Sequence, residues 1–404
     1  MAALKYWIWL TAVPGLTNRS RLQLLAHFSS PEDVYYADME EAVAAGLSRE
    51  QAERLADRSL ERTEAILADC AKKELFVLTM DDAAYPIRLR NIFDPPILLY
   101  GRGAMPLFDE EAAVAVVGTR AATPYGIHSA EELSYQMVRS GALIVSGMAK
   151  GIDAAAHRGA LRAGGFTAAV LGCGVDVAYP ESNRRLYEDI AATGVILSEY
   201  APGTTPEGLR FPARNRIISG LSMATLVVEA PERSGALITA RTALDQGRDV
   251  FAVPGPIDAP ESRGCNQLIR SGAGLVAQAW DLLGEYEYRF PHKLRPTEKK
   301  MPPTPEETAE VVPGTAEKVE TLPVLTGEQL RGLTEDQLRV MRALPADRPM
   351  LTDDLAEETA LPVRRVLASL TILEIDGFVR PSGARCFVRA AELPQEEIEH
   401  GKKG

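Results

Sequence analysis

Three arginines and a phenylalanine gather in the seven residues RFPARNR, at positions 210–216. A guanidinium group binds phosphate through two parallel hydrogen bonds, and an aromatic ring can stack on a nucleobase. The whole chain is acidic, with 44 Lys and Arg against 56 Asp and Glu and a formal net charge of -12. We therefore expect Arg210, Phe211, Arg214 and Arg216 to line a narrow electropositive groove in an acidic molecule. Phe211 and Arg214 are the predicted direct contacts to nucleic acid.

Part of this segment is equally suited to a structural role. Asn215 and Arg216 are the residues that we expect to point inward and hold the loop in place. An alternative is that the arginines here form a network with Glu199 or Glu229 in the core. Arg216 therefore has two interpretations, a phosphate contact and an internal ion pair.

A second candidate follows the apolar run AAVAVVG, where Gly118, Thr119 and Arg120 come at the end of an expected strand. A glycine lets the backbone approach a ligand closely, and the hydroxyl and guanidinium groups can bind phosphate. The chain contains neither G-x-G-x-x-G nor G-x-x-x-x-G-K-[ST]. A dinucleotide cofactor or an NTPase site is therefore poorly supported.

A third candidate is the segment SGMAKGIDAAAH, at residues 146–157, in which Lys150 precedes an expected helix. Asp153 and His157 stand one turn apart on that helix, a spacing that suits acid–base catalysis. The alternative, which we favour, is that Asp153 interacts with the helix start and His157 fills a packed, hydrogen-bonded niche. No Ser or Cys in a triad setting strengthens the catalytic interpretation.

Two further segments place polar groups after expected strands. In LGCGVDVAYPESN, residues 171–183, Asn183 opens the following helix and can shape the same crevice. In EAPERSGALITA, residues 229–240, Ser234 and Gly235 open a helix, and a helix N-terminus attracts anions. For residues 171–183 the alternative is a plain strand-to-helix connection, and for residues 229–240 it is simple helix capping.

The elements that must position these residues alternate between strands and helices. Continuous apolar runs separated by helical patterns indicate an α/β fold with a doubly wound, mainly parallel sheet. Ligands of such sheets bind outside the carboxyl ends of the strands, where the candidate residues lie. The expected strands are 112–118, 142–147, 166–172, 194–200, 224–230 and 249–255.

Composition shifts divide the chain into five parts. We expect a helical domain of helix-hairpin-helix or SAM-like type, an α/β core, a linker rich in Pro, Glu, Thr and Lys, a winged helix and a charged tail. The winged helix is predicted from three capped helices followed by a hairpin at Pro-Ser-Gly. The boundaries are 1–65, 66–285, 286–327, 328–392 and 393–404.

The cysteine pattern and hydropathy exclude several classes of protein. The four cysteines are far apart and form no C-x-x-C pair, which argues against a zinc site or a disulfide framework and suits a reducing cytoplasm. No stretch of about 18 apolar residues occurs, so we expect no membrane insertion. We expect no metal and no cofactor.

Taken together, these motifs resemble the DprA/Smf family, the DNA-processing proteins of bacterial transformation. The resemblance implies a Rossmann-like core, a homodimer, and a non-enzymatic protein that binds single-stranded DNA. It also implies that the protein loads RecA recombinase and overcomes single-strand-binding protein. The matching segments follow one another in order: VGTR, SGMAKGIDAAAH, VLGCGVDVAYPESN, SEYAPGTTP, FPARNRIISGLS, VVEAPERSGALITARTALDQGRDVFAVPG and GCNQLIRSGA.

Carried over by motif, the resemblance assigns DNA contact to Arg120, Phe211, Arg214 and Arg216. Lys150 and Asn183 are weaker candidates. The family's Y-P-x-x-N stretch can carry a basic residue at its third position. This chain has Glu181 there, which removes that contribution.

An enzyme is the main alternative to a DNA-binding function. The core is also similar to LOG-type phosphoribohydrolases, although EAPERSGALITA lacks their double glycine and the Glu three residues after Thr239.

The ligand of the winged helix is left open by its charge. The winged helix carries 9 Arg and 9 acidic residues over 331–390, so it could bind either DNA or protein. DNA reading would involve Arg364 and Arg365 on the recognition helix, with Arg380 and Arg385 on the wing. A transcription factor built around this module is the least favoured class, since it leaves the glycine-lined core without a role.

Overall fold

The computed structural model describes residues 3–296, 325, 330, 332–345, 350–381 and 386–391. The chain forms two compact units, Met1–Lys300 and Met301–Gly404, which are described separately. Most of the expected linker and all of the expected charged tail lie outside the described residues.

The centre of the first unit is a nine-stranded sheet with the order β1-β2-β6-β5-β4-β3-β7-β8-β9. Strands β3 to β9 are parallel, while β1 and β2 form an antiparallel edge beside β6. All six expected strands are present, as β3 to β8, and the doubly wound α/β fold is confirmed. The strand bounds are β1 Phe76–Thr79, β2 Leu98–Gly103, β3 Ala113–Val117, β4 Leu143–Ser146, β5 Thr167–Leu171, β6 Val195–Ser198, β7 Ala224–Val227, β8 Asp249–Ala252 and β9 Gly274–Leu275.

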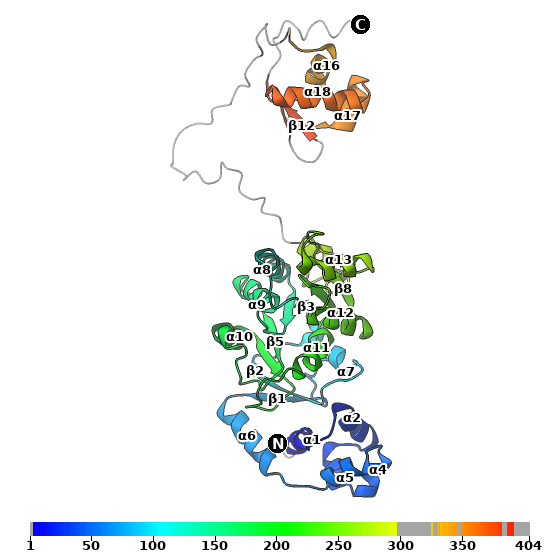
Figure 1. The fold of residues 1–404 in the computed structure, drawn as a ribbon. Helices are drawn as coiled ribbons and strands as arrows, with labels where there is room; N and C mark the ends of the chain where they lie inside the picture. The colour runs from blue at the N-terminus through cyan, green and yellow to red at the C-terminus, as the bar shows by residue number, and fades with distance from the viewer. Residues whose placement is uncertain are drawn as a thin grey trace. The chain divides into compact units, whose positions relative to one another are not determined.

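Helices cover both faces of the sheet, and Figure 1 shows α8, α9 and α10 on one side and α11, α12 and α13 on the other. Side chains alternate along β3, so that Val114 and Val116 pack under α8 and α9 while Ala115 and Val117 pack under α11 and α12. This burial on both faces explains why the strands are continuously apolar in sequence. The bounds are α8 Pro124–Arg139, α9 Ile152–Arg162, α10 Arg184–Thr193, α11 Arg210–Gly220, α12 Gly235–Asp245, α13 Arg263–Arg270, with short α7 Ile87–Arg90 and α14 Ala279–Leu283.

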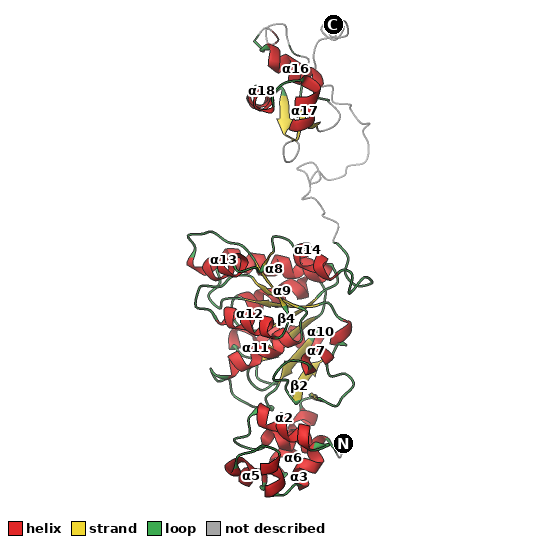
Figure 2. Ribbon diagram, turned by 90° about the vertical axis from the view of Figure 1, so that its right-hand side faces the viewer, coloured by secondary structure: helices red, strands yellow, loops and turns green. Residues whose placement is uncertain are grey.

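The N-terminal segment is helical, as expected, and Figures 1 and 2 show it beside β1 and β2. Side-chain caps at Thr17, Ser30, Asp38 and Ser48 start four of its helices. Helix α6 crosses the boundary that composition placed at residue 65. The bounds are α1 Leu4–Ala12, α2 Asn18–His27, α3 Pro31–Tyr36, α4 Met39–Ala44, α5 Arg49–Leu55 and α6 Glu61–Lys72.

The first unit extends beyond residue 285, where the linker was expected to begin. Phe290 and Leu294 are buried against the α8 side of the sheet, and the Arg295 N–H donates to the Ser140 carbonyl at 3.0 Å. Among the described residues of this unit there are also four short 3₁₀ turns, at Phe108–Glu110, Glu181–Asn183, Pro260–Ser262 and Gly284–Tyr286.

The second unit is a small winged helix with its own core. Its strands pair antiparallel in the order β10-β12-β11. Thr334 caps the first helix through its hydroxyl, which accepts from the Gln337 N–H. Arg365 pairs with Asp336 on α16, while Arg364 and Arg380 are exposed and Arg385 lies outside the described residues. The bounds are α16 Glu335–Ala343, β10 Met350–Leu351, α17 Thr352–Thr359, α18 Val363–Ile375, β11 Val379–Pro381 and β12 Cys386–Arg389.

Within the described parts of the chain, no helix has the length and apolar character needed to cross a bilayer. The same residues contain no group of three or more His, Cys, Asp or Glu side chains that could hold a metal ion.

Candidate nucleic-acid interface

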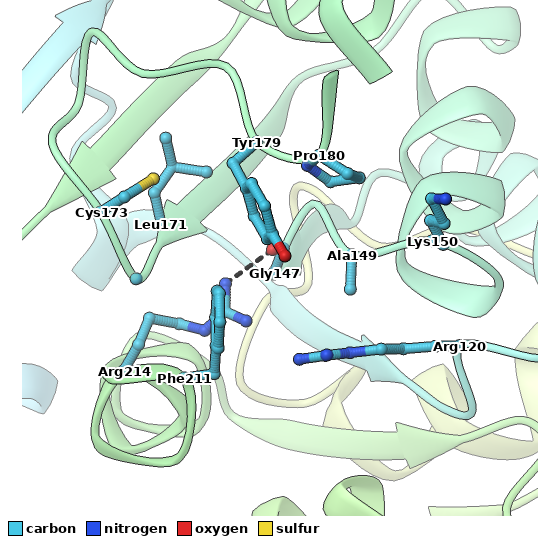
Figure 3. Close-up of a pocket in the computed structure, with 11 residues that line it drawn as sticks. Arg120, Gly147, Ala149, Lys150, Leu171, Cys173, Tyr179, Pro180, Phe211 and Arg214 are labelled. Atoms are coloured by element: carbon cyan, nitrogen blue, oxygen red, sulfur yellow. Dashed lines mark hydrogen bonds between the residues drawn. The ribbon is translucent and has the colours of Figure 1, made fainter. Parts of the chain in front are cut away.

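The loops after β3, β4 and β5 and the first turn of α11 enclose a pocket of about 220 Å³ (Figure 3). Because the strands are parallel, their carboxyl ends meet at one edge of the sheet and bring distant segments together. The lining residues are Arg120, Gly147, Ala149, Lys150, Leu171, Gly172, Cys173, Tyr179, Pro180, Phe211 and Arg214.

An aromatic pair with a neighbouring cation forms one wall of this pocket. The rings of Tyr179 and Phe211 are stacked, with centroids 5.5 Å apart and an interplanar angle of 23°. The Arg120 guanidinium carbon lies 5.1 Å from the Phe211 ring centroid, and Figure 3 shows the Arg120 side chain extending toward the Phe211 ring. Arg120 is exposed and Phe211 is half-buried, so both can reach a ligand. A ring that stacks a base beside a cation that binds phosphate is the chemistry of single-strand binding.

Arg214 lies deeper in the pocket, and its residue is only 4% exposed. Its Nη1 group donates to the Gly147 carbonyl at 2.6 Å and also to the Val170 carbonyl. Burial lowers the pKa of this guanidinium, and the nearby Asp153 carboxylate partly opposes that effect. Arg214 therefore joins the ends of β4 and β5 at the floor of the pocket, a structural task that accompanies any contact with a ligand.

Arg216 points away from this pocket into an ion-pair network. Its Nε donates to Asp94 at 2.9 Å, and its Nη2 donates to Glu199 at 2.8 Å. Burial alone would lower the Arg216 pKa, but the two carboxylates, Glu199 foremost, raise it. The expected alternative of an internal pair with Glu199 is present in the structure, and it fixes the start of α11 against β6.

The loop between β4 and α9 is held in shape by its neighbours. Gly151 has a φ of +77°, and a Cβ atom there would lie 2.3 Å from the Thr119 carbonyl oxygen. The Asn183 side-chain amide donates to the Met148 carbonyl at 2.9 Å. Asn183 thus supports the loop that carries Lys150, which is exposed at the pocket rim.

The Glu229 side chain lies at the N-terminus of α8, the helix that follows β3. Many α/β proteins bind a phosphate at such a helix N-terminus. The Thr123 N–H and hydroxyl donate to the two Glu229 carboxylate oxygens at 2.8 and 2.7 Å, directly before α8. A Cβ atom at Gly126 would lie 2.3 Å from Glu229 Oε2, so the helix start fits closely around the carboxylate. The protein therefore fills this anion site with its own side chain.

The similarities to known proteins agree with this geometry. Residues 76–287 match the family model described as DNA recombination-mediator protein A, and residues 326–384 match the DprA winged helix domain. A protein named Smf from Synechocystis is 37% identical over 386 residues, which cover 93% of this chain and 96% of the relative. The chain belongs to the DprA family.

A sequence match and a structural match both come from DprA of Streptococcus pneumoniae. The DNA processing protein DprA of that species is 48% identical over 207 residues, which cover 51% of this chain and 73% of the relative. An X-ray structure of DprA from that species superimposes with a TM-score of 0.63 at 39% identity. That match covers 70% of this chain and 97% of the solved one. The DprA resemblance predicted from the motifs is confirmed.

The two groups proposed for acid–base work are buried in this DprA core. His157 is 0% exposed, and its Nδ1 lies 2.7 Å from the Thr167 hydroxyl. Burial lowers the pKa of His157 to about 3. Asp153 accepts from the Ala149 N–H at 3.3 Å, and burial raises its pKa. These surroundings support the structural interpretation of both residues.

The remaining candidates lie outside the pocket lining. Ser234 caps α12, with its hydroxyl accepting from the Ala236 N–H at 3.2 Å, and Gly235 is exposed beside it. Gly118 is needed for close packing, because a Cβ atom there would lie 2.4 Å from Ile152. The Thr119 hydroxyl accepts from the Ala121 N–H at 3.3 Å, which shapes the turn that carries Arg120.

The pocket thus gathers Arg120, Lys150, Phe211 and Arg214 from the expected set. Sequence reasoning did not single out Tyr179, which lies in the segment of residues 171–183. An aromatic residue soon after a strand's carboxyl end was the available signal, since that edge is where a doubly wound sheet binds ligands.

Proposed function

We propose that this protein binds single-stranded DNA in the pocket of Arg120, Tyr179 and Phe211 during DNA processing in transformation. The observation that carries the proposal is the stacked Tyr179–Phe211 pair with the exposed Arg120 guanidinium over the Phe211 ring. Further support comes from membership of a family whose relatives are named DNA processing proteins.

A single strand suits this pocket better than a duplex does. The Phe211 ring is half-buried in a space of about 220 Å³, so a base must leave a helical stack to reach it. Unpaired bases do this at little cost, whereas duplex bases must first be unstacked. Stacking on an aromatic ring tolerates any base, so binding should depend little on sequence.

Each side chain of the pocket has its own role in this proposal. A base that stacks on Phe211 competes with Arg120 or Tyr179 for the ring, and a displaced Arg120 guanidinium can then bind the adjoining phosphate. Lys150 adds a second cation at the rim. Arg214 holds the pocket floor, and Arg216 anchors α11 against Asp94 and Glu199.

Membership of the family also supports a finer biological role. We propose that the protein delivers bound strands to RecA recombinase and overcomes single-strand-binding protein, acting as a cytoplasmic homodimer without catalysis of its own. The family description, a recombination mediator, supports this assignment.

A nucleotide hydrolase receives less support. The Glu229 carboxylate already occupies the N-terminus of α8, where it would repel a phosphate. His157 is enclosed and uncharged at neutral pH, so it cannot act on a ligand in the pocket.

Titration of fluorescein-labelled oligo-dT at several salt concentrations tests the proposal. We expect the logarithm of the association constant to fall linearly with the logarithm of salt concentration, by about 0.7 per phosphate bound. Arg120→Ala should make that slope shallower by about 0.7, because one phosphate contact is lost. Arg139→Ala, which removes an exposed arginine at the far end of α8, is the matched control and should leave the slope unchanged. A flat salt response of the unaltered protein, or tighter binding to duplex, would contradict the proposal.

A further inference from the structure

A second cavity, of about 360 Å³, lies between the N-terminal helices and the core. Its lining includes Thr11 at the end of α1, Arg62 on α6, Tyr200 after β6, and Arg210 on α11. We call this cavity the interdomain cleft.

The interdomain cleft and the Phe211 pocket share the first turn of α11. Arg210 and Ala213 line the cleft, while Phe211 and Arg214 line the pocket. Adjacent residues of one helical turn therefore face the two cavities. A strand that leaves the pocket over this turn reaches the cleft within the next nucleotides.

The cleft repeats the chemistry of the pocket. The Arg210 guanidinium carbon lies 5.2 Å from the centroid of the half-buried Tyr200 ring, as Arg120 lies beside Phe211. The Arg210 Nη1 group donates to the Thr205 carbonyl at 2.5 Å. Its Nη2 group pairs with Glu207 at 2.9 Å, but Glu207 is well exposed, and such surface pairs contribute little. The Nη2 side of Arg210 and the Tyr200 ring are thus available to a phosphate and a base.

The charges around the cleft favour an anion. Four arginines line it, Arg21, Arg62, Arg210 and Arg216, together with the carboxylates Asp94 and Glu199. Arg216 already pairs with both of these acids, at 2.9 and 2.8 Å. The other three arginines exceed the remaining negative charge, so the cleft carries a net positive charge.

Arg62 is the most accessible of these cations. It is exposed on α6, and its Nη1 group donates to the Ala12 carbonyl at a long 3.5 Å. Arg21 is tied more firmly, because it donates to the Leu10 and Thr11 carbonyls at 3.1 and 2.7 Å. Arg62 can therefore bind a phosphate without giving up a strong internal contact.

We infer that the interdomain cleft is a second binding site for the same single strand, with a base on Tyr200 and phosphates at Arg62 and Arg210. The N-terminal helical domain then takes part in DNA binding directly. This inference rests on the function proposed above, because the strand reaches the cleft from the Phe211 pocket.

Arg62→Ala tests the inference, with Arg139→Ala as the control for loss of one exposed positive charge. For fluorescein-labelled dT15, we expect Arg62→Ala to weaken binding about fivefold at 0.1 M salt and to make the salt slope shallower by about 0.7. The dinucleotide TpT has a single phosphate and so cannot supply both the Arg120 and the Arg62 contact; Arg62→Ala should therefore bind it like the unaltered protein. Equal losses for both ligands, or no loss for dT15 relative to Arg139→Ala, would overturn the inference. Thermal melting within about 2 °C of the unaltered protein shows that the variant is folded.

Photo-cross-linking gives an independent measurement that separates the two proposals. A dT15 strand with 5-iododeoxyuridine substituted in turn along its length should cross-link to Tyr200 as well as to the Tyr179–Phe211 pair. Cross-links at Tyr179 or Phe211 with none at Tyr200 would overturn the cleft site and leave the proposed function standing. Normal affinity of Arg120→Ala and Phe211→Ala, with cross-links at neither place, would overturn both.

Discussion

Arg214 offers a sharp test of how the pocket is built, because its side chain is buried while Arg120 beside it is exposed. Replacing Arg214 with Ala removes a guanidinium that donates to the Gly147 and Val170 carbonyls. Both carbonyls lie at strand ends in the interior. We expect Arg214→Ala to destabilise the first unit, and to weaken DNA binding mainly through that damage.

The magnitude follows from the two lost bonds. A hydrogen bond from a charged donor contributes about 1.5–3 kcal/mol, and a buried acceptor left without a partner costs about 1–3 kcal/mol. Removing the buried charge recovers part of its own desolvation cost, so the net loss should be about 3 kcal/mol. Because the entropy of unfolding is about 2.1 cal/mol/K per residue, that loss lowers the melting temperature of a unit of this size by about 5 °C.

Thermal melting followed by far-ultraviolet circular dichroism measures this change. Arg120→Ala is the matched variant, since it removes the same group from an exposed position and should shift melting by less than about 2 °C. Arg214→Lys keeps the charge but has a shorter side chain, so its melting temperature should lie between those of Arg214→Ala and Arg120→Ala. An Arg214→Ala protein that melts like the unaltered chain yet binds oligo-dT as poorly as Arg120→Ala would refute this reasoning, and would make Arg214 a direct DNA contact.

Three other changes have defined outcomes. Phe211→Ala should weaken oligo-dT binding by about 1–3 kcal/mol, roughly 5- to 150-fold, whereas Phe211→Trp keeps a stacking surface and should bind nearly normally in the same titration. His157 stays neutral when folded because burial lowers its pKa to about 3, so only the unfolded chain gains its proton between pH 6.5 and pH 3. Between pH 6.5 and pH 5, the free energy of unfolding measured in urea should therefore fall by about 1.6 kcal/mol more for the unaltered protein than for His157→Gln, and equal decreases would contradict that account. Deletion of residues 328–404 should leave most of the oligo-dT affinity, and a loss above about tenfold would assign the winged helix a main role in binding.

Much of the fold could be predicted because its strands are buried on both faces. Strand β3 pairs with a strand on each side and is covered by helices on both faces, so every position in it must be apolar. Its sequence, AAVAVVG, is apolar throughout. The winged helix was predictable for a different reason. Its first helix starts at the capping residue Thr334, whose side chain accepts from a backbone N–H as expected.

The separation of the arginines into buried and exposed was harder to predict, although one signal existed. Arg214 shares the helical face of Ile217, Ile218 and Leu221, all of them buried, at spacings of three, four and seven residues. An arginine on an apolar stripe is expected to point inward with hydrogen-bonded partners. Those partners, at the ends of β4 and β5, are far away in sequence and could not be named beforehand.

The other contacts that could not be predicted join residues that are far apart in the sequence. Arg216 meets Asp94 from 122 residues away, and no local pattern marks that contact. The interdomain cleft likewise combines side chains from α1, α6 and α11 with Tyr200 after β6. The packing of the helical domain against the sheet decides which of these residues come into contact, and that packing cannot be predicted from composition.

A crystal structure of the protein with oligo-dT tests the central claim most directly. We expect a base stacked on Phe211 or inserted beside Tyr179, and a phosphate oxygen within hydrogen-bonding distance of the Arg120 guanidinium. A strand that runs elsewhere on the molecule, with Arg120 still over the Phe211 ring and the pocket empty, would contradict the account.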